Sequence, residues 1–170
     1  MINLRVLSCG MTILVVLGVN APSVEGQADD FAVRFEFGVC RTDILDTFTG
    51  VFTKDLGGDP RQFVTIPLTL PEDQVRTIYK AIEEIGFFNL VSPFRGVPSG
   101  LDRVTVFGPS SSYRLAVRNG GVVHTVSWND AFKPTTAEAD RLRHLFSMIV
   151  GWINEHPEVK RLPPPTGGCE

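Results

Sequence analysis

The sequence predicts an α+β protein: a mostly antiparallel sheet of about six strands, in the order βββαβββα, with two helices packed on one face. Several short segments alternate apolar and polar residues with the period of a half-buried strand, and two longer segments repeat apolar residues at helical spacing. Each helix has one apolar stripe to bury, which places both helices against the same face of the sheet.

Six segments have the pattern or composition of strands. Residues 31–39 alternate almost perfectly, with five apolar side chains on one face. Residues 44–54 are rich in threonine and aromatic side chains, which favours a strand over a helix. The other expected strands are 64–68, 104–107, 113–118 and 122–128, the last two joined by the hairpin turn Asn119-Gly120-Gly121.

Capping-box sequences, in which a threonine side chain caps the first turn, predict the starts of two helices. Thr69-Leu70-Pro71-Glu72 opens the first helix, which Gly86 ends. Thr135-Thr136-Ala137-Glu138 opens the second, which His156-Pro157 ends. We therefore expect one helix in each half of the chain.

The N-terminus has the pattern of a cleavable secretory signal. Arg5 precedes an uncharged apolar run of 14 residues, whereas a membrane-spanning helix needs about 20. Small residues favour cleavage after Gly26 or Ala28. The expected organisation is a signal peptide over 1–28, a single domain over 29–162, and a Pro/Gly-rich tail over 163–170 that forms neither helix nor sheet.

Export places the protein outside the cytoplasm, either secreted or periplasmic, with no stable membrane anchor after cleavage. Cys9 resembles a lipid attachment site, but only eight residues precede it and the apolar run follows it, so we do not expect lipidation there. The net charge of −3 comes without a basic cluster, which argues against nucleic acid or an anionic membrane as partner.

Two cysteines remain after cleavage, Cys40 and Cys169. An even count in an oxidising compartment suggests a disulfide between them. It would close a loop of 128 intervening residues and tie down the tail. The alternative is that Cys169, next to the last residue, stays unpaired.

The segment 46–55 is the most unusual polar stretch, with Asp-Thr-Phe followed by Thr-Lys-Asp. In one interpretation its side chains line a binding edge. In the other, which we favour, Asp46 and Thr47 bond neighbouring backbone and Lys54-Asp55 begins a turn. The residues concerned are Asp46, Thr47, Thr53, Lys54 and Asp55.

These motifs, together with the Thr-x-Pro-Glu helix start at 69–72, resemble those of a group of uncharacterised exported bacterial proteins. The resemblance covers roughly residues 31–90. It implies export and a shared fold, and it implies no activity.

Candidate catalytic residues are few. His124 could act as a general base, or Cys40, beside Arg41, could act as a nucleophile. A small secreted hydrolase that uses His124 or Cys40 is therefore the alternative. No nucleophile elbow or phosphate loop accompanies them. Asp140 and His144 have the spacing of an ordinary surface pair on a helix, which we favour over metal ligation. We expect no metal and no cofactor.

The favoured hypothesis is a non-enzymatic binding or interaction module that recognises a protein or a component of the cell envelope. Two loops, 92–100 and 129–134, are candidate recognition segments. Phe94, Trp128 and Phe132 are the candidate binding residues, because exposed aromatic side chains often anchor interfaces. If these three side chains are buried, this particular binding surface loses its support.

Overall fold

The computed structural model describes residues 30–40, 42–100, 105–106 and 108–166. The expected signal over 1–28, the cleavage sites and Cys169 lie outside the described residues. The elements in chain order are β1 (Ala32–Gly38), β2 (Asp43–Asp46), β3 (Val51–Gly57), β4 (Gln62–Pro67), α1 (Glu72–Ile85), the 3-10 turn η1 (Phe87–Asn89), β5 (Thr105–Val106), β6 (Ser112–Asn119), β7 (Val122–Asn129), β8 (Phe132–Lys133), α2 (Ala137–Glu155) and α3 (Pro157–Lys160).

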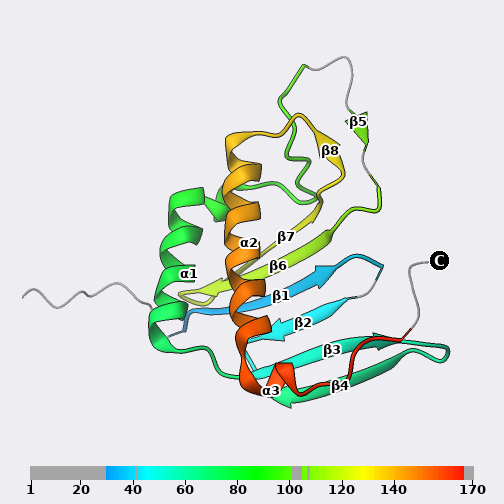
Figure 1. The fold of residues 1–170 in the computed structure, drawn as a ribbon. Coiled ribbons are helices and arrows are strands. Elements are labelled where there is room, and N and C mark those ends of the chain that lie inside the picture. Colours follow the sequence, from blue (N-terminus) through cyan, green and yellow to red (C-terminus); the bar gives the residue numbers. More distant parts are fainter. Residues whose placement is uncertain (1–29, 41, 101–104, 107, 167–170) are drawn as a thin grey trace, which may run out of the picture.

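Six strands form one antiparallel sheet in the order β4-β3-β2-β1-β6-β7. The first four strands follow one another as a meander, and the hairpin of β6 and β7 then adds to the free side of β1. Figure 1 shows β4 at one edge of the sheet and β7 at the other. The predicted α+β class with a mostly antiparallel sheet is confirmed.

The predicted single strand over 44–54 is wrong, because this segment forms two strands, β2 and β3, with a tight turn between them. The turn needs a backbone with positive φ, and Gly50 supplies it with φ of 69°. Aspartate and threonine favour such a turn because their side chains bond nearby backbone groups. Threonine also favours strands, so the composition of this segment did not distinguish a turn from a strand.

The predicted strand over 104–107 is also misplaced. Of this range, the described Thr105–Val106 form β5, which pairs with β8 and not with the six-stranded sheet. The sheet still has six strands, because the division of 44–54 into two strands offsets the loss of the strand predicted at 104–107. The order within it and the two long helices is therefore ββββαββα and not βββαβββα.

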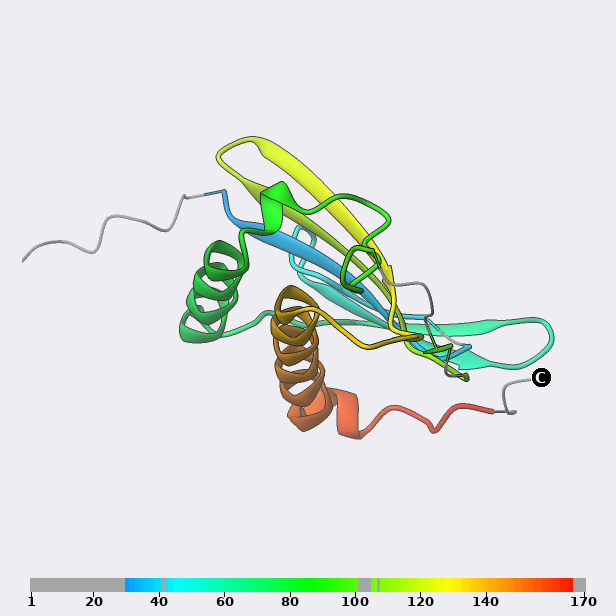
Figure 2. The same cartoon turned by 90° about the horizontal axis from the view of Figure 1, so that it is seen from above.

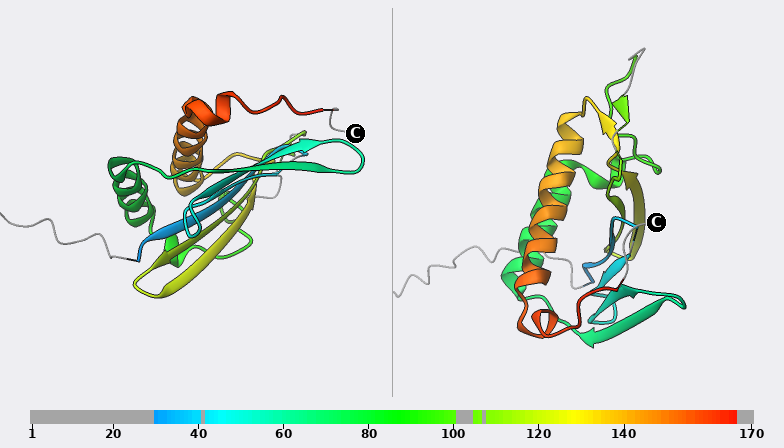
Figure 3. Two further views of the ribbon diagram at one scale, coloured as in Figure 1. Left: turned by 90° about the horizontal axis from the view of Figure 1, so that it is seen from below. Right: turned by 45° about the vertical axis from the view of Figure 1, so that its right-hand side comes forward.

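Both long helices cover the same face of the sheet, as predicted (Figure 2). Phe35 in β1 is fully buried there, with its ring centroid 4.7 Å from that of Phe146 in α2. Along β1, Val33, Phe35 and Phe37 are buried while Arg34 and Glu36 are not, so the strand alternates between core and the opposite face. No described helix covers that opposite face (Figure 3).

The two helix starts differ from the capping-box prediction. Pro71 is the N-cap residue of α1 and makes no side-chain capping bond, so the predicted cap by Thr69 is wrong. In α2 the N-cap is Thr136, one residue after the expected Thr135, and its Oγ1 accepts a hydrogen bond from the Ala139 N–H at 3.2 Å. Thr135 instead donates to Asp140.

This difference predicts unequal effects of two matched substitutions. Thr136→Ala is expected to lower the free energy of unfolding by about 1 kcal/mol, because it removes the acceptor for a first-turn N–H group. Thr69→Ala, at an exposed position that caps nothing, is expected to change it by less than about 0.5 kcal/mol. Denaturant titration of both variants measures the difference, and equal losses would contradict the cap assignment.

The described part of the tail ends in a contact that its composition does not predict. After α3, Thr166 pairs with Gly57 in a parallel bridge, and both its N–H and its hydroxyl donate to the Leu56 carbonyl, at 2.7 and 3.0 Å. The prediction that the tail over 163–170 forms no sheet contact is therefore wrong at Thr166. This contact fixes the tail against the end of β3.

Candidate functional site

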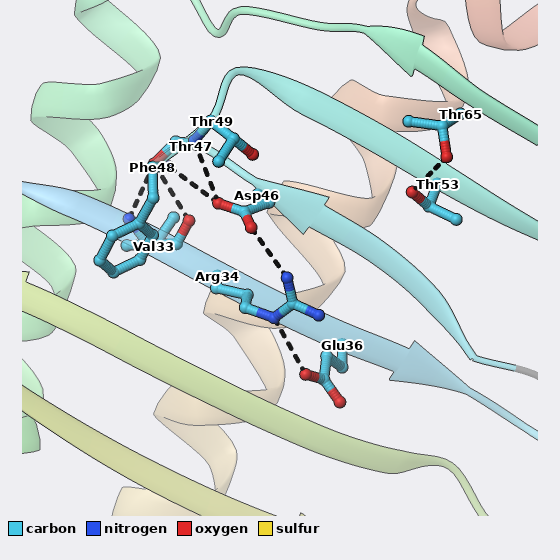
Figure 4. Close-up of polar contacts among 9 residues, drawn as sticks. All are labelled: Val33, Arg34, Glu36, Asp46, Thr47, Phe48, Thr49, Thr53 and Thr65. Carbon is cyan, nitrogen blue, oxygen red and sulfur yellow. Dashed lines mark hydrogen bonds and ion pairs between the residues drawn. The ribbon is translucent and has the colours of Figure 1, made fainter.

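The turn between β2 and β3 is held by the side chains of Asp46 and Thr47 (Figure 4). Asp46 Oδ1 accepts hydrogen bonds from the N–H groups of Phe48 and Thr49, at 2.9 and 3.3 Å. Thr47 Oγ1 accepts from the Val33 N–H at 2.8 Å and donates to the Val33 carbonyl at 3.0 Å. Both residues therefore bond neighbouring backbone, as the favoured interpretation of this segment predicts.

Arg34 lies on the face of the sheet away from the helices and bridges two carboxylates (Figure 4). Its Nη1 donates to Asp46 Oδ2 at 2.8 Å, and its Nε donates to Glu36 Oε1 at 3.2 Å. Partial burial opposes the charge of Arg34, but the hydrogen bonds to Asp46 and Glu36 outweigh burial and raise the pKa of its guanidinium. The arginine is thus held in one orientation.

Asp55 is a buried charge that joins three segments of chain, and sequence reasoning missed this role. Its side chain is 0% exposed and lies 3.2 Å from Arg61 Nε. Asp55 Oδ1 accepts from the Gly57 N–H at 2.8 Å, and Oδ2 accepts from the Thr42 N–H at 3.1 Å. Asp55 lies within β3 beside a bulge, so it does not begin the turn as predicted. Gly57 is only two residues away, but Thr42 lies 13 residues away, and no sequence motif joins these partners to Asp55.

Three arginines mark the face of the sheet that lacks a helix, which we call the outer sheet face. Its central strands, β1 and β6, carry Arg34, Arg114 and Arg118 on the side opposite the buried residues. Arg118 lies 3.3 Å from an Asp30 carboxylate oxygen and 4.6 Å above the Phe48 ring. Arg114 is exposed, and no described residue pairs with its guanidinium.

His124 does not stand in a catalytic arrangement. Its Nε2 lies 2.9 Å from the Leu90 carbonyl oxygen, and its ring contacts the rings of Phe87 and Phe88. Within the described part of the chain, no serine, cysteine or carboxylate bonds to it. Its strand neighbour Val117 pairs with Val33 at the start of β1.

Cys40 lies beyond the opposite end of β1, which extends about 16 Å from Val33 to Gly38. The structure therefore does not bring His124 and Cys40 together, and no described residue completes a catalytic arrangement with His124. The Cys40 carbonyl accepts a hydrogen bond from Arg61 Nη2 at 2.8 Å, and its backbone φ is 61°. Its predicted partner Cys169 lies outside the described residues, so the disulfide stays a prediction.

The aromatic binding surface is not supported. Trp128 is only 3% exposed and packs in the core, with ring contacts to Phe94, Tyr113 and Phe146. Phe94 and Phe132 are half-buried. The correction follows from the strand itself, because Trp128 alternates with outward positions and shares its face with the buried Val126.

Asp140 and His144 show no sign of a metal site. Hydrogen bonds from Thr135 and Arg143 hold Asp140, and these two partners lower the pKa of its carboxyl. Over the residues that the structure describes, no group of three or more histidine, cysteine or acidic side chains could hold a metal ion. Asp140 therefore stabilises the start of α2 through its hydrogen bonds with Thr135 and Arg143.

Taken together, these residues define an α+β protein whose polar side chains stabilise turns and strand ends and whose outer sheet face is open. No family model matches the sequence, and no curated protein matches it either.

Proposed function

We propose that the chain is an exported, non-enzymatic binding module whose outer sheet face docks a protein or a component of the cell envelope. The observation that carries this proposal is the arrangement of arginines on a rigid surface. Arg34 and Arg118 are held by carboxylates and by an aromatic ring, whereas Arg114 is exposed and unpaired among the described residues. In the register of β1 with β6, Arg34 lies between Arg118 and Arg114.

The chemistry of this surface indicates the kind of partner. Arginine is enriched at interface positions that carry much of the binding energy. One reason is that its planar guanidinium donates two parallel hydrogen bonds to a single carboxylate. Arg34 and Arg118 are already held by their partners, so these two side chains lose little conformational freedom on binding. A partner that places a carboxylate opposite Arg114 would complete the pairing on this face.

The proposed location outside the cytoplasm rests on the sequence. The signal pattern over 1–28 and the resemblance of 31–90 to exported bacterial proteins both support it. β1 begins at Ala32, so cleavage after Gly26 or Ala28 would remove no residue of the described strands. Among the described residues, no helix has the length and hydrophobicity to span a membrane.

Arg114→Ala tests the proposal against a matched change, Lys80→Ala, at an exposed position on α1. The cleaved protein would be immobilised and its envelope or secreted fraction passed over it. Arg114→Ala is expected to weaken retention of the bound component about tenfold or more, while Lys80→Ala leaves it unchanged. Equal retention by both variants would contradict docking on the outer sheet face.

A further inference from the structure

The two edge strands of the sheet, β7 and β4, differ in whether other residues hydrogen-bond to their outer sides. Along β7, the segment after η1 covers part of the edge: the Phe94 N–H donates to the Ser127 carbonyl at 2.8 Å, and Ser92 Oγ accepts from the Ser127 N–H at 3.1 Å. Covering an edge in this way prevents another strand from pairing there. Along β4, no described residue bonds to the open side (Figure 1).

The pairing of β4 with β3 shows which backbone groups point outward. The Leu68 N–H donates to the Gly50 carbonyl, so that pair is a hydrogen-bonded one, and the bonding pairs then alternate along the ladder. Phe63 and Thr65 fall in the non-bonded pairs. Their N–H and C=O groups therefore point away from β3 and are free to pair with another strand.

The side chains of β4 also lack the usual protection of an edge. The strand reads Gln-Phe-Val-Thr-Ile-Pro and carries no charged residue, and Phe63 is 53% exposed. Natural edge strands commonly carry lysine, which opposes pairing. Proline is present, at Pro67, but only at the last position.

We propose that two copies of the chain associate through their β4 strands, antiparallel about a two-fold axis at Val64. In this register Phe63 of each copy lies opposite Thr65 of the other, and every outward N–H and C=O of these residues is paired. A register centred nearer Pro67 loses hydrogen bonds, because proline has no N–H.

A second copy suits this edge for a reason of charge. Across a two-fold axis a charged strand meets its own charge, which is unfavourable, whereas the neutral β4 meets none. The two sheets then join into one, and both outer sheet faces lie on the same side. The association does not depend on the proposed binding function, since β4 is the far edge from β7 and carries none of the three arginines.

Sedimentation equilibrium of the cleaved protein, from about 1 μM to about 1 mM, tests this association. Phe63→Pro removes only an outward N–H and an exposed ring, so the ladder with β3 is kept. Val123→Pro is the matched control, because Val123 is 57% exposed and lies at an outward position of the other edge strand. Far-UV circular dichroism checks that both variants fold.

The expected result is a concentration-dependent dimer whose dissociation constant rises about tenfold or more in Phe63→Pro and stays unchanged in Val123→Pro. In the proposed register Val64 faces itself in a close pair, so Val64→Cys should give a disulfide-linked dimer on oxidation. A single-chain mass at every concentration would overturn the proposal, as would a dimer disrupted by Val123→Pro and not by Phe63→Pro.

Discussion

Replacing Asp55 with alanine is expected to lower the free energy of unfolding by about 3–4 kcal/mol. The carboxylate is fully buried and accepts from the Gly57 and Thr42 N–H groups while facing Arg61 Nε. Its removal leaves the buried Gly57 N–H and the partly buried Thr42 N–H without their acceptor, so the desolvation of these two groups is no longer compensated.

The measurement is a denaturant titration of the variant beside Asp59→Ala. Asp59 is exposed on the same hairpin, and its replacement is expected to change the free energy by less than about 0.5 kcal/mol. Asp55→Asn should have a free energy of unfolding close to that of the alanine variant. The amide nitrogen that replaces one carboxylate oxygen is a donor, so it cannot accept the hydrogen bond that this oxygen accepted. A loss below about 1 kcal/mol for Asp55→Ala would contradict the structural role of this carboxylate.

The second large effect concerns the disulfide, which we propose between Cys40 and Cys169. Thr166 is bonded to the Leu56 carbonyl, and Cys40 is bonded through Arg61 to the neighbouring Asp55. Three further residues of extended chain reach about 10 Å, enough to span from Thr166 to this corner of the sheet. The bond would close the long loop predicted from the sequence.

Cys169→Ser is expected to lower the free energy of unfolding by about 4–5 kcal/mol, the chain-entropy value for a loop of this length. Reduction of the wild-type protein should give a similar loss, and reduction of the variant should give none. Intact-mass analysis without reductant is expected to show two hydrogens fewer than the free-thiol mass. Two free thiols in the exported protein would contradict the bond.

Local patterns were sufficient to predict most of the fold. Alternation in β1 and the helical spacing of α1 and α2 define the sheet and its covered face, because burial repeats every two residues in a strand and every three to four in a helix. The segment 44–54 divided unexpectedly, since threonine suits both strands and turns. The missing cap at Thr69 shows that a capping-box sequence does not ensure the geometry.

The candidate site was harder to predict because its contacts are long-range. The Gly57 N–H is local to Asp55, but Thr42 and Arg61 belong to other segments that the folded sheet brings to it. Trp128 was a different case, since its alternation with outward positions already placed it beside Val126 in the core. The arginines of the outer sheet face carry no motif, because their meaning comes from the register of β1 with β6.

Docking on the outer sheet face is tested most directly by photo-cross-linking in the producing cells. A photoreactive residue would replace exposed Arg114 on β6, which pairs with Glu36 of β1 and Ser127 of β7. As the comparison, it would replace exposed His144 on α2. Arg114 itself carries proposed binding energy, so Thr125 on β7 offers a second probe on the same face. We expect one discrete adduct from position 114 or 125 and none from 144. An adduct from position 144 alone, or from no position, would contradict docking on this face.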